Sequence, residues 1–138
     1  MIANERLNSL RQKFASMPFC KYLDMQLVGL DEGLASVRIP FREELTQYLS
    51  TIHGAVITAA ADSAVAVALL TRLQADARVT TIEMKVNFLR GVSGSDIVAT
   101  AKIIHLGATI ALGDVDIRDR DRNLIAKCTA TYMILEKR

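Results

Sequence analysis

Apolar and polar residues follow different periods along the chain, and each period predicts a type of element. Near the start, Leu7, Leu10 and Phe14 recur at near-helical spacing, which predicts a short amphipathic helix over residues 4–15. Two short stretches, MQLVGL and LASVRIP, follow as candidate strands. The DEG sequence between them favours a hairpin, so the first part of the chain is expected to hold one helix and two paired strands.

The most apolar stretch of the chain starts at the pair His53 and Gly54 and is rich in alanine, the residue with the highest helix propensity. It predicts a long helix over residues 54–73. Because the stretch is apolar on nearly every side, we expect this helix to be buried. Its apolar part is too short for a comfortable membrane span and includes Asp62 and two hydroxyl residues.

A period of two appears in the second half of the chain. The sequence TTIEMKVNFL places Ile82, Met84, Val86 and Phe88 on one face, which predicts a half-buried strand. Three further strands are predicted at DIVATAKIIH, TIALGDVDIRD and LIAKCTATYMIL, with turns at HLGA and RDRN. One very apolar helix followed by four long strands predicts an α+β fold, mainly antiparallel, in which the sheet wraps around the helix.

Composition narrows the class of protein. The 138 residues, 51% of them hydrophobic, are expected to form a single domain over residues 1–138, with a helical segment over residues 1–20 before its main body. A net charge of +2 and an aromatic content of 5% favour neither nucleic acid nor a membrane as a partner. The initial MIANERLNSLRQKF lacks the apolar core of a signal peptide, which predicts a cytoplasmic protein. Cys20 and Cys128 lack metal-ligand spacing and are expected to be buried free thiols.

Two features of the long helix suggest chemistry. Asp62 lies in the middle of apolar residues, where an ionised carboxylate is costly unless it is compensated or used. Such a group is suited to attack a carbonyl or to activate a water molecule. Gly54 is expected at the helix start, where free backbone N–H groups can bind an anion or a carbonyl oxygen that becomes negative. Without a Cβ, Gly54 also lets another molecule approach closely.

The spacing of these two residues bears on how they could cooperate. Asp62 follows Gly54 by eight residues, which is about 12 Å along a helix, so one chain cannot easily aim both groups at one bond. Two antiparallel helices in a two-fold dimer could, if the groups do cooperate. The alternative is that Asp62 is a buried residue satisfied by backbone or hydroxyl partners. His53 is likewise open to a packing or capping role.

Three segments carry a resemblance to a known family. IHGAVITAAADSA, TTIEMKVNFLRGV and IIHLGATIALGDVDIRDRDRNLIAKCTATYMIL together resemble the hotdog-fold acyl-CoA thioesterases of the phenylacetic-acid-degradation type, over residues 25–135. The resemblance implies an antiparallel sheet around a long central helix, with dimers joined edge to edge and commonly paired into homotetramers. It implies an acyl-CoA substrate and no separate cofactor or metal, since coenzyme A is part of the substrate.

The resemblance also implies roles for particular residues. Asp62 would be the nucleophile or general base, and the Gly54 N–H would polarise the thioester carbonyl across the dimer interface. His53 would help to fix the substrate end of its loop, and Thr81, or Thr80 if the register is shifted by one, would position the attacking water. The remaining implied site residues are Gln47, in place of an asparagine that contacts the thioester or water, and Arg90, Gly107, Ala108 and Thr109 for coenzyme A.

Some positions depart from the family pattern, and other functions stay open. Ala55 replaces the second glycine of the usual pair, Gln47 is one methylene longer than asparagine, and Gly91 stands where a proline is common. A hotdog hydratase or dehydratase would need a histidine as its base, and only His53 and His105 are available. A non-catalytic module that binds or senses acyl-CoA is the third possibility. The sequence does not set the acyl group.

Overall fold

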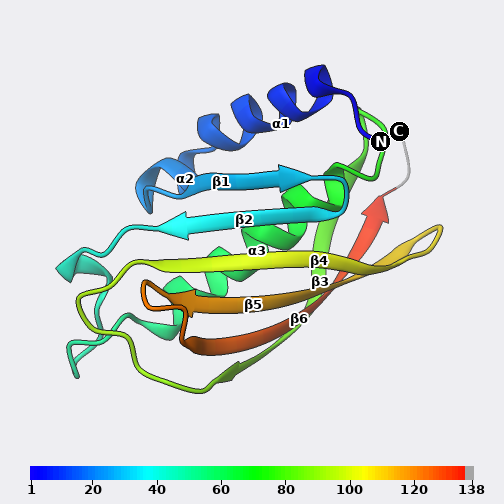
Figure 1. Cartoon of the computed structure of the whole chain (residues 1–138). Coiled ribbons are helices and arrows are strands. Elements are labelled where there is room, and N and C mark those ends of the chain that lie inside the picture. Colours follow the sequence, from blue (N-terminus) through cyan, green and yellow to red (C-terminus); the bar gives the residue numbers. More distant parts are fainter. Residues whose placement is uncertain (136–138) are drawn as a thin grey trace.

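A six-stranded antiparallel sheet curves around one long helix in the computed structural model, which describes residues 1–135 (Figure 1). The strand order is β1-β2-β4-β5-β6-β3, so β1 and β3 form the two edges. In chain order the elements are α1 (Asn4–Ser16), α2 (Pro18–Tyr22), β1 (Gln26–Asp31), β2 (Leu34–Ile39), the 3-10 turn η1 (Glu43–Leu45), α3 (Gly54–Leu70), β3 (Arg78–Phe88), β4 (Ile97–Leu106), β5 (Ile110–Asp119) and β6 (Leu124–Leu135).

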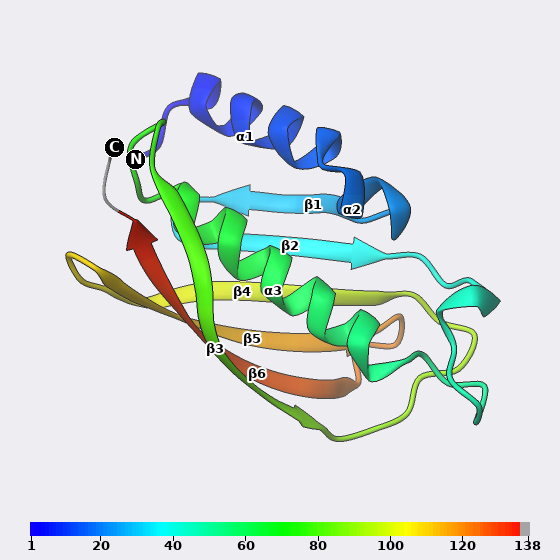
Figure 2. The ribbon, with the colours of Figure 1, turned by 180° about the vertical axis from the view of Figure 1, so that it is seen from behind.

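The long helix α3 lies against the concave face of the sheet, as its apolar composition predicts (Figure 2). Its three valines and four of its seven alanines are buried, and Ala60, Ala64 and Ala68 are fully buried. Helix and sheet approach closely at Gly113 on β5, where an added Cβ would lie only 2.6 Å from Cγ1 of Val65. The predicted buried helix is therefore confirmed, and small residues on both elements allow its close contact with the sheet.

The amino-terminal helices lie beside the main body of the fold. Helix α1 lies next to β1, with its side chains Leu10 and Phe14 each 2% exposed (Figure 2). Because these residues are four apart, they lie on one face of the helix, and the predicted amphipathic helix is confirmed. The short helix α2 was not predicted; it starts at Pro18, whose fixed φ suits the first position of a helix.

The edge strand β3 differs from its predicted pattern at one residue. A β-bulge lies between Thr81 and Glu83, so Ile82 has no paired residue on β6 and is 52% exposed. The prediction that Ile82 shares a face with Met84 and Val86 is wrong, because a bulge inserts one residue and reverses the alternation of side chains. Thr81 therefore joins the inward face, whereas a continuous strand would turn it outward.

The cysteines and the lengths of the helices bear on two further expectations. Cys20 and Cys128 are free and buried, as predicted, and burial raises the pKa of the Cys128 thiol to about 11. Within residues 1–135, no helix has both the length and the apolar character that crossing a membrane requires.

Candidate active site

The carboxylate of Asp62 receives hydrogen bonds from two hydroxyl groups on two different strands. Asp62 is half-buried in the middle of α3. The Thr81 hydroxyl of β3 donates to Asp62 Oδ1 at 2.7 Å, and the Tyr132 hydroxyl of β6 contacts the same oxygen. The Tyr132 hydroxyl also lies 2.8 Å from the backbone carbonyl oxygen of Asp62. Of the two threonines considered for the first strand after the helix, Thr81 contacts Asp62, while Thr80 is exposed.

Both hydroxyl groups bind the same oxygen of the carboxylate, Oδ1, and this leaves the other oxygen available for chemistry. Among residues 1–135, no hydrogen bond reaches the second oxygen, Oδ2 of Asp62. The side chain is therefore oriented through one oxygen, while the other can accept a proton or attack a carbonyl. The two hydroxyl groups are the partners expected if Asp62 were only a buried structural residue. They satisfy one oxygen of the half-buried carboxylate and leave the other available.

Tyr132 is a candidate site residue that the sequence interpretation did not identify. It lies on β6 directly opposite Thr81 and is 3% exposed. Burial, and next the hydrogen bond to Asp62, hold the pKa of its hydroxyl well above the ordinary value of 10.0, so the group stays protonated and donates. The sequence does hold one indication of this position. Cys128, Ala130 and Tyr132 alternate along the strand, so the tyrosine hydroxyl follows two small residues on the inward face.

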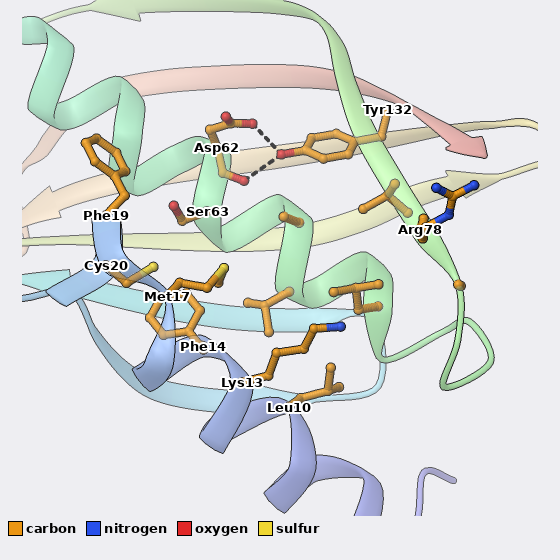
Figure 3. A pocket seen from close by; sticks show the side chains of 15 residues that line it. Leu10, Lys13, Phe14, Met17, Phe19, Cys20, Asp62, Ser63, Arg78 and Tyr132 are labelled. Atoms are coloured by element: carbon orange, nitrogen blue, oxygen red, sulfur yellow. Dashed lines mark hydrogen bonds between the residues drawn. The ribbon is translucent and has the colours of Figure 1, made fainter.

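Asp62 and Tyr132 line a cavity of about 390 Å³ between α3 and the amino-terminal helices (Figure 3). We call it the N-terminal cavity. Most of its wall is apolar, and the polar groups beside Asp62 and Tyr132 are few. Its lining residues are Leu10, Lys13, Phe14, Met17, Phe19, Cys20, Asp62, Ser63, Ala66, Val67, Leu70, Ala77, Arg78, Val79 and Tyr132. The carboxylate therefore faces a predominantly apolar space.

Gly54 begins α3, as predicted, and lines a separate cavity of about 340 Å³, which we call the helix-start cavity. An added Cβ on Gly54 would lie 3.1 Å from Cζ of Phe88, so glycine permits the contact between the helix start and this ring. His53 is the N-cap residue: its Nδ1 accepts a hydrogen bond from the Ala55 N–H at 2.9 Å. The capping role left open for His53 is therefore present in the structure.

Gln47 and Arg90 also line the helix-start cavity. The Gln47 side-chain amide is held within its own loop, donating to Thr51 Oγ1 and accepting from the Leu49 N–H. Arg90 follows the end of β3 and is exposed. The structure thus brings together Gly54, Gln47 and Arg90 among the predicted site residues.

The predicted coenzyme A residues do not meet within one chain. The turn Gly107, Ala108 and Thr109 joins β4 to β5, and the Thr109 carbonyl accepts from the Ile134 N–H, beside the first residues of β3. Arg90 lies beyond the last residue of β3. Because β3 has 11 residues, its ends are about 33 Å apart.

Gly54 and Asp62 are likewise separated within one chain. They are eight residues apart on α3, about 12 Å along the helix axis, and line different cavities. In the described residues 1–135, no group of three or more His, Cys, Asp or Glu side chains is placed to hold a metal ion. The chemistry available at Asp62 is proton transfer or nucleophilic attack at the end of an apolar cavity.

Comparison with known proteins adds a family to this geometry. A model described as the Thioesterase superfamily matches residues 49–126. A Saccharolobus solfataricus protein named as an esterase is 33% identical over 115 residues, which cover 83% of this chain and 81% of that protein. A Salmonella typhimurium protein named as a medium/long-chain acyl-CoA thioesterase is 27% identical over 150 residues, with 97% of each chain covered.

Among solved structures, the Escherichia coli PaaI protein from the phenylacetic acid degradation operon has a TM-score of 0.89 and 19% identity, covering 99% of this chain and 97% of that one. At this identity the likeness concerns the fold alone, and it confirms the predicted antiparallel sheet around a central helix.

Proposed function

Because the chain belongs to the thioesterase superfamily and is a thioester hydrolase, we propose that it cleaves an acyl-CoA to a carboxylic acid and free coenzyme A. The observation that carries this proposal is the half-buried Asp62, which lines an apolar cavity and is oriented by Thr81 and Tyr132 through one oxygen, while no hydrogen bond within residues 1–135 reaches the other. The names of the similar proteins, an esterase and an acyl-CoA thioesterase, support the same reaction class.

Asp62 performs one of two balanced reactions. As a general base it takes a proton from water, the hydroxide adds to the thioester carbonyl carbon, and the C–S bond breaks as the thiolate receives the proton. As a nucleophile it forms a mixed anhydride and releases the thiol, and water then hydrolyses the anhydride. Label in Asp62 after a single turnover in heavy-oxygen water establishes the nucleophilic route, because it enters Asp62 only when water attacks the Asp62 carboxyl carbon of the anhydride.

The second part of the proposal concerns the dimer. Within one chain Asp62 and Gly54 line different cavities, so we place the Gly54 N–H of a second copy beside the thioester held at Asp62. That N–H stabilises the negative charge on the carbonyl oxygen in the transition state. The edge strand β3 supports pairing of two copies, because its outer backbone groups are a template for another strand.

The same pairing accounts for the predicted coenzyme A residues. Antiparallel pairing of two copies of β3 places the Arg90 end of one strand beside the Gly107–Thr109 end of the other. Arg90 and the turn backbone then bind the phosphates of one coenzyme A from two subunits. A dimer of such dimers is the homotetramer that the family resemblance implies, and molar mass from light scattering tests both assemblies.

The rival functions differ from hydrolysis in specific ways. A hydratase needs a histidine as its base, whereas His53 uses Nδ1 to cap α3 and His105 is exposed at the end of β4. Neither residue lines the N-terminal cavity, so the geometry favours the carboxylate over a histidine. A non-catalytic binding module would bind acyl-CoA but release no thiol.

The experiment measures thiol release from a panel of aryl-, short- and medium-chain acyl-CoAs by the wild type and Asp62→Asn. We expect the variant to lose about a hundredfold or more of the turnover while it keeps its fold and oligomeric mass. Asp121→Asn, the same chemical change in an exposed turn, serves as the matched control. Full turnover by Asp62→Asn would overturn the mechanism, and saturable binding without turnover by the wild type would favour the binding module.

A further inference from the structure

The N-terminal cavity extends along one face of α3, starting at the catalytic carboxylate. Asp62, Ala66 and Leu70 line it at intervals of four residues, so they follow one another on successive turns. From Asp62 to Leu70 the helix advances about 12 Å. The cavity is therefore a long apolar space with one reactive group at its end, and not a compact pocket around that group.

The opposite wall of this cavity comes from the amino-terminal helices. Leu10 and Phe14 of α1 and Cys20 of α2 are buried beside it, with Met17 and Phe19 nearer the surface (Figure 3). These helices precede residues 49–126, the part of the chain that matches the family model. The amino-terminal segment that forms this wall thus lies outside the matched residues.

One hydrogen bond ties this wall to the central helix. Arg6 of α1 donates from Nη2 to the carbonyl oxygen of Leu70 at 3.1 Å, which joins the start of α1 to the last turn of α3. Figure 3 shows Asp62 and Tyr132 at one end of the cavity and Leu10 at the other. The Arg6 contact is therefore made through Leu70, the α3 lining residue that lies two turns from the carboxylate.

We propose that the N-terminal cavity binds the acyl chain of a medium-length aliphatic acyl-CoA. This inference rests on the proposed function and names the substrate class of the same site. The thioester carbonyl lies at Asp62, and the chain follows Ala66 toward Leu70. A single aromatic ring would occupy only the part beside Asp62 and leave the rest of the 390 Å³ unfilled, whereas a flexible chain contacts the whole apolar wall.

The amino-terminal helices then determine specificity through chain length. Each methylene that enters the cavity gains contact with apolar side chains, and the gain ends where the apolar lining ends, at Leu70 on α3. Lys13 and Arg78 are exposed residues at the wall, and their aliphatic stems add apolar surface to it.

Filling the cavity at one position tests the proposal. Ala66→Phe places a ring in the path of the chain, one turn beyond Asp62, and Ala15→Phe adds the same ring to the exposed face of α1 as the matched control. We expect Ala66→Phe to lower the ratio of kcat/KM for decanoyl-CoA to that for butyryl-CoA by about tenfold or more. Ala15→Phe leaves the ratio at its wild-type value. An unchanged ratio in a folded Ala66→Phe protein overturns the proposal.

A second variant tests the same space in the opposite direction. Leu70→Ala removes side-chain volume at the remote end and is expected to move the preferred substrate from decanoyl-CoA toward tetradecanoyl-CoA. This variant keeps the Leu70 carbonyl that Arg6 contacts, so it remains informative if Ala66→Phe does not fold. A chain-length profile identical to that of the wild type contradicts the assignment.

Binding without turnover separates this proposal from the proposed function. Calorimetry with Asp62→Asn measures the affinity for decanoyl-CoA relative to coenzyme A alone, and the double variant Asp62→Asn/Ala66→Phe repeats it. We expect Asp62→Asn to bind decanoyl-CoA more tightly than coenzyme A alone. In the double variant this gain in affinity should be about tenfold smaller. If the wild type releases no thiol but this difference in affinity is found, the proposed hydrolysis is wrong, while the N-terminal cavity still binds the acyl chain. Equal affinities of the two variants for decanoyl-CoA would show that the cavity does not bind the chain.

Discussion

Thr81 donates a hydrogen bond of 2.7 Å to Oδ1 of Asp62 from a position 19 residues further along the chain. The bond exists because the bulge at Ile82 reverses the side-chain alternation of β3. Met84 and Val86 face inward beyond the bulge, and Thr81 faces inward before it. One inserted residue at a sheet edge thus places a hydroxyl beside the carboxylate of the central helix.

The first prediction concerns that hydroxyl. Thr81→Val keeps the shape and strand propensity of the residue but removes the donor to Asp62, so we expect kcat to fall by about tenfold with a small change in KM. Thr80→Val, the same change at an exposed neighbour, should keep wild-type kinetics. Steady-state thiol release measures both. Equal kinetics in the two variants would show that Thr81 has no part in orienting Asp62.

The second prediction concerns stability at high pH. The pKa of Tyr132 is raised on folding, so the stability linked to this group is fully present below the unfolded pKa near 10 and is lost as the pH rises further. We expect the free energy of unfolding of the wild type to fall with a contribution of about 1.4 kcal/mol per pH unit from this residue. In Tyr132→Phe that contribution is absent, because no hydroxyl ionises in the unfolded chain.

Urea unfolding between pH 9 and 12, about the pKa range of tyrosine, measures this slope in each variant. Tyr48→Phe is the matched control, since Tyr48 is 93% exposed and has no buried hydroxyl to protect. Its slope should equal that of the wild type. A Tyr132→Phe protein with an unchanged slope would contradict the assignment of a buried, protonated Tyr132.

The third prediction concerns the helix start. Gly54→Ala introduces a methyl group 3.1 Å from the Phe88 ring, which is 55% exposed and can move aside. We expect the fold to persist, while the methyl group displaces a thioester carbonyl from the backbone N–H and lowers kcat/KM by about a hundredfold.

The double variant Gly54→Ala/Phe88→Leu distinguishes two explanations. It relieves the contact with the ring but leaves the methyl group in the helix-start cavity. If the glycine is needed for substrate approach, activity stays low in the double variant. Recovery of wild-type kcat/KM would instead assign the loss to a displaced Phe88.

The fourth prediction concerns packing between helix and sheet. A Cβ at Gly113 would lie 2.6 Å from Cγ1 and 2.9 Å from Cγ2 of Val65, a β-branched side chain with little freedom to rotate. Gly113→Ala should therefore lower the free energy of unfolding by about 2 kcal/mol. Gly29→Ala, whose Cβ would meet Ser36 at an ordinary 3.4 Å, should change stability little. Denaturant unfolding compares the two, and Gly113→Ala/Val65→Ala should recover part of the loss.

Much of the candidate site follows from the sequence, and its limits have physical causes. Asp62 and Gly54 stand out because a charge within apolar residues and a glycine at a helix start are local anomalies that need no tertiary contact to recognise. Tyr132 lacks such an anomaly, because a tyrosine in a strand is ordinary. Its role depends on the pairing of β6 with β3, which joins residues far apart in the chain.

The sequence by itself determined the order of the six strands and the two longer helices and the burial of α3, and it singled out Asp62 as the candidate carboxylate, because periodicity and composition are local properties. Only the tertiary structure decided the bulge at Ile82 and the face of α3 that lines the cavity. A helix that is apolar on all sides gives no indication of its rotation, so Ala66 and Val65 are equivalent in sequence. Packing against the sheet buries Val65 at Gly113 and leaves Ala66 beside the amino-terminal helices, and this rotation creates the N-terminal cavity.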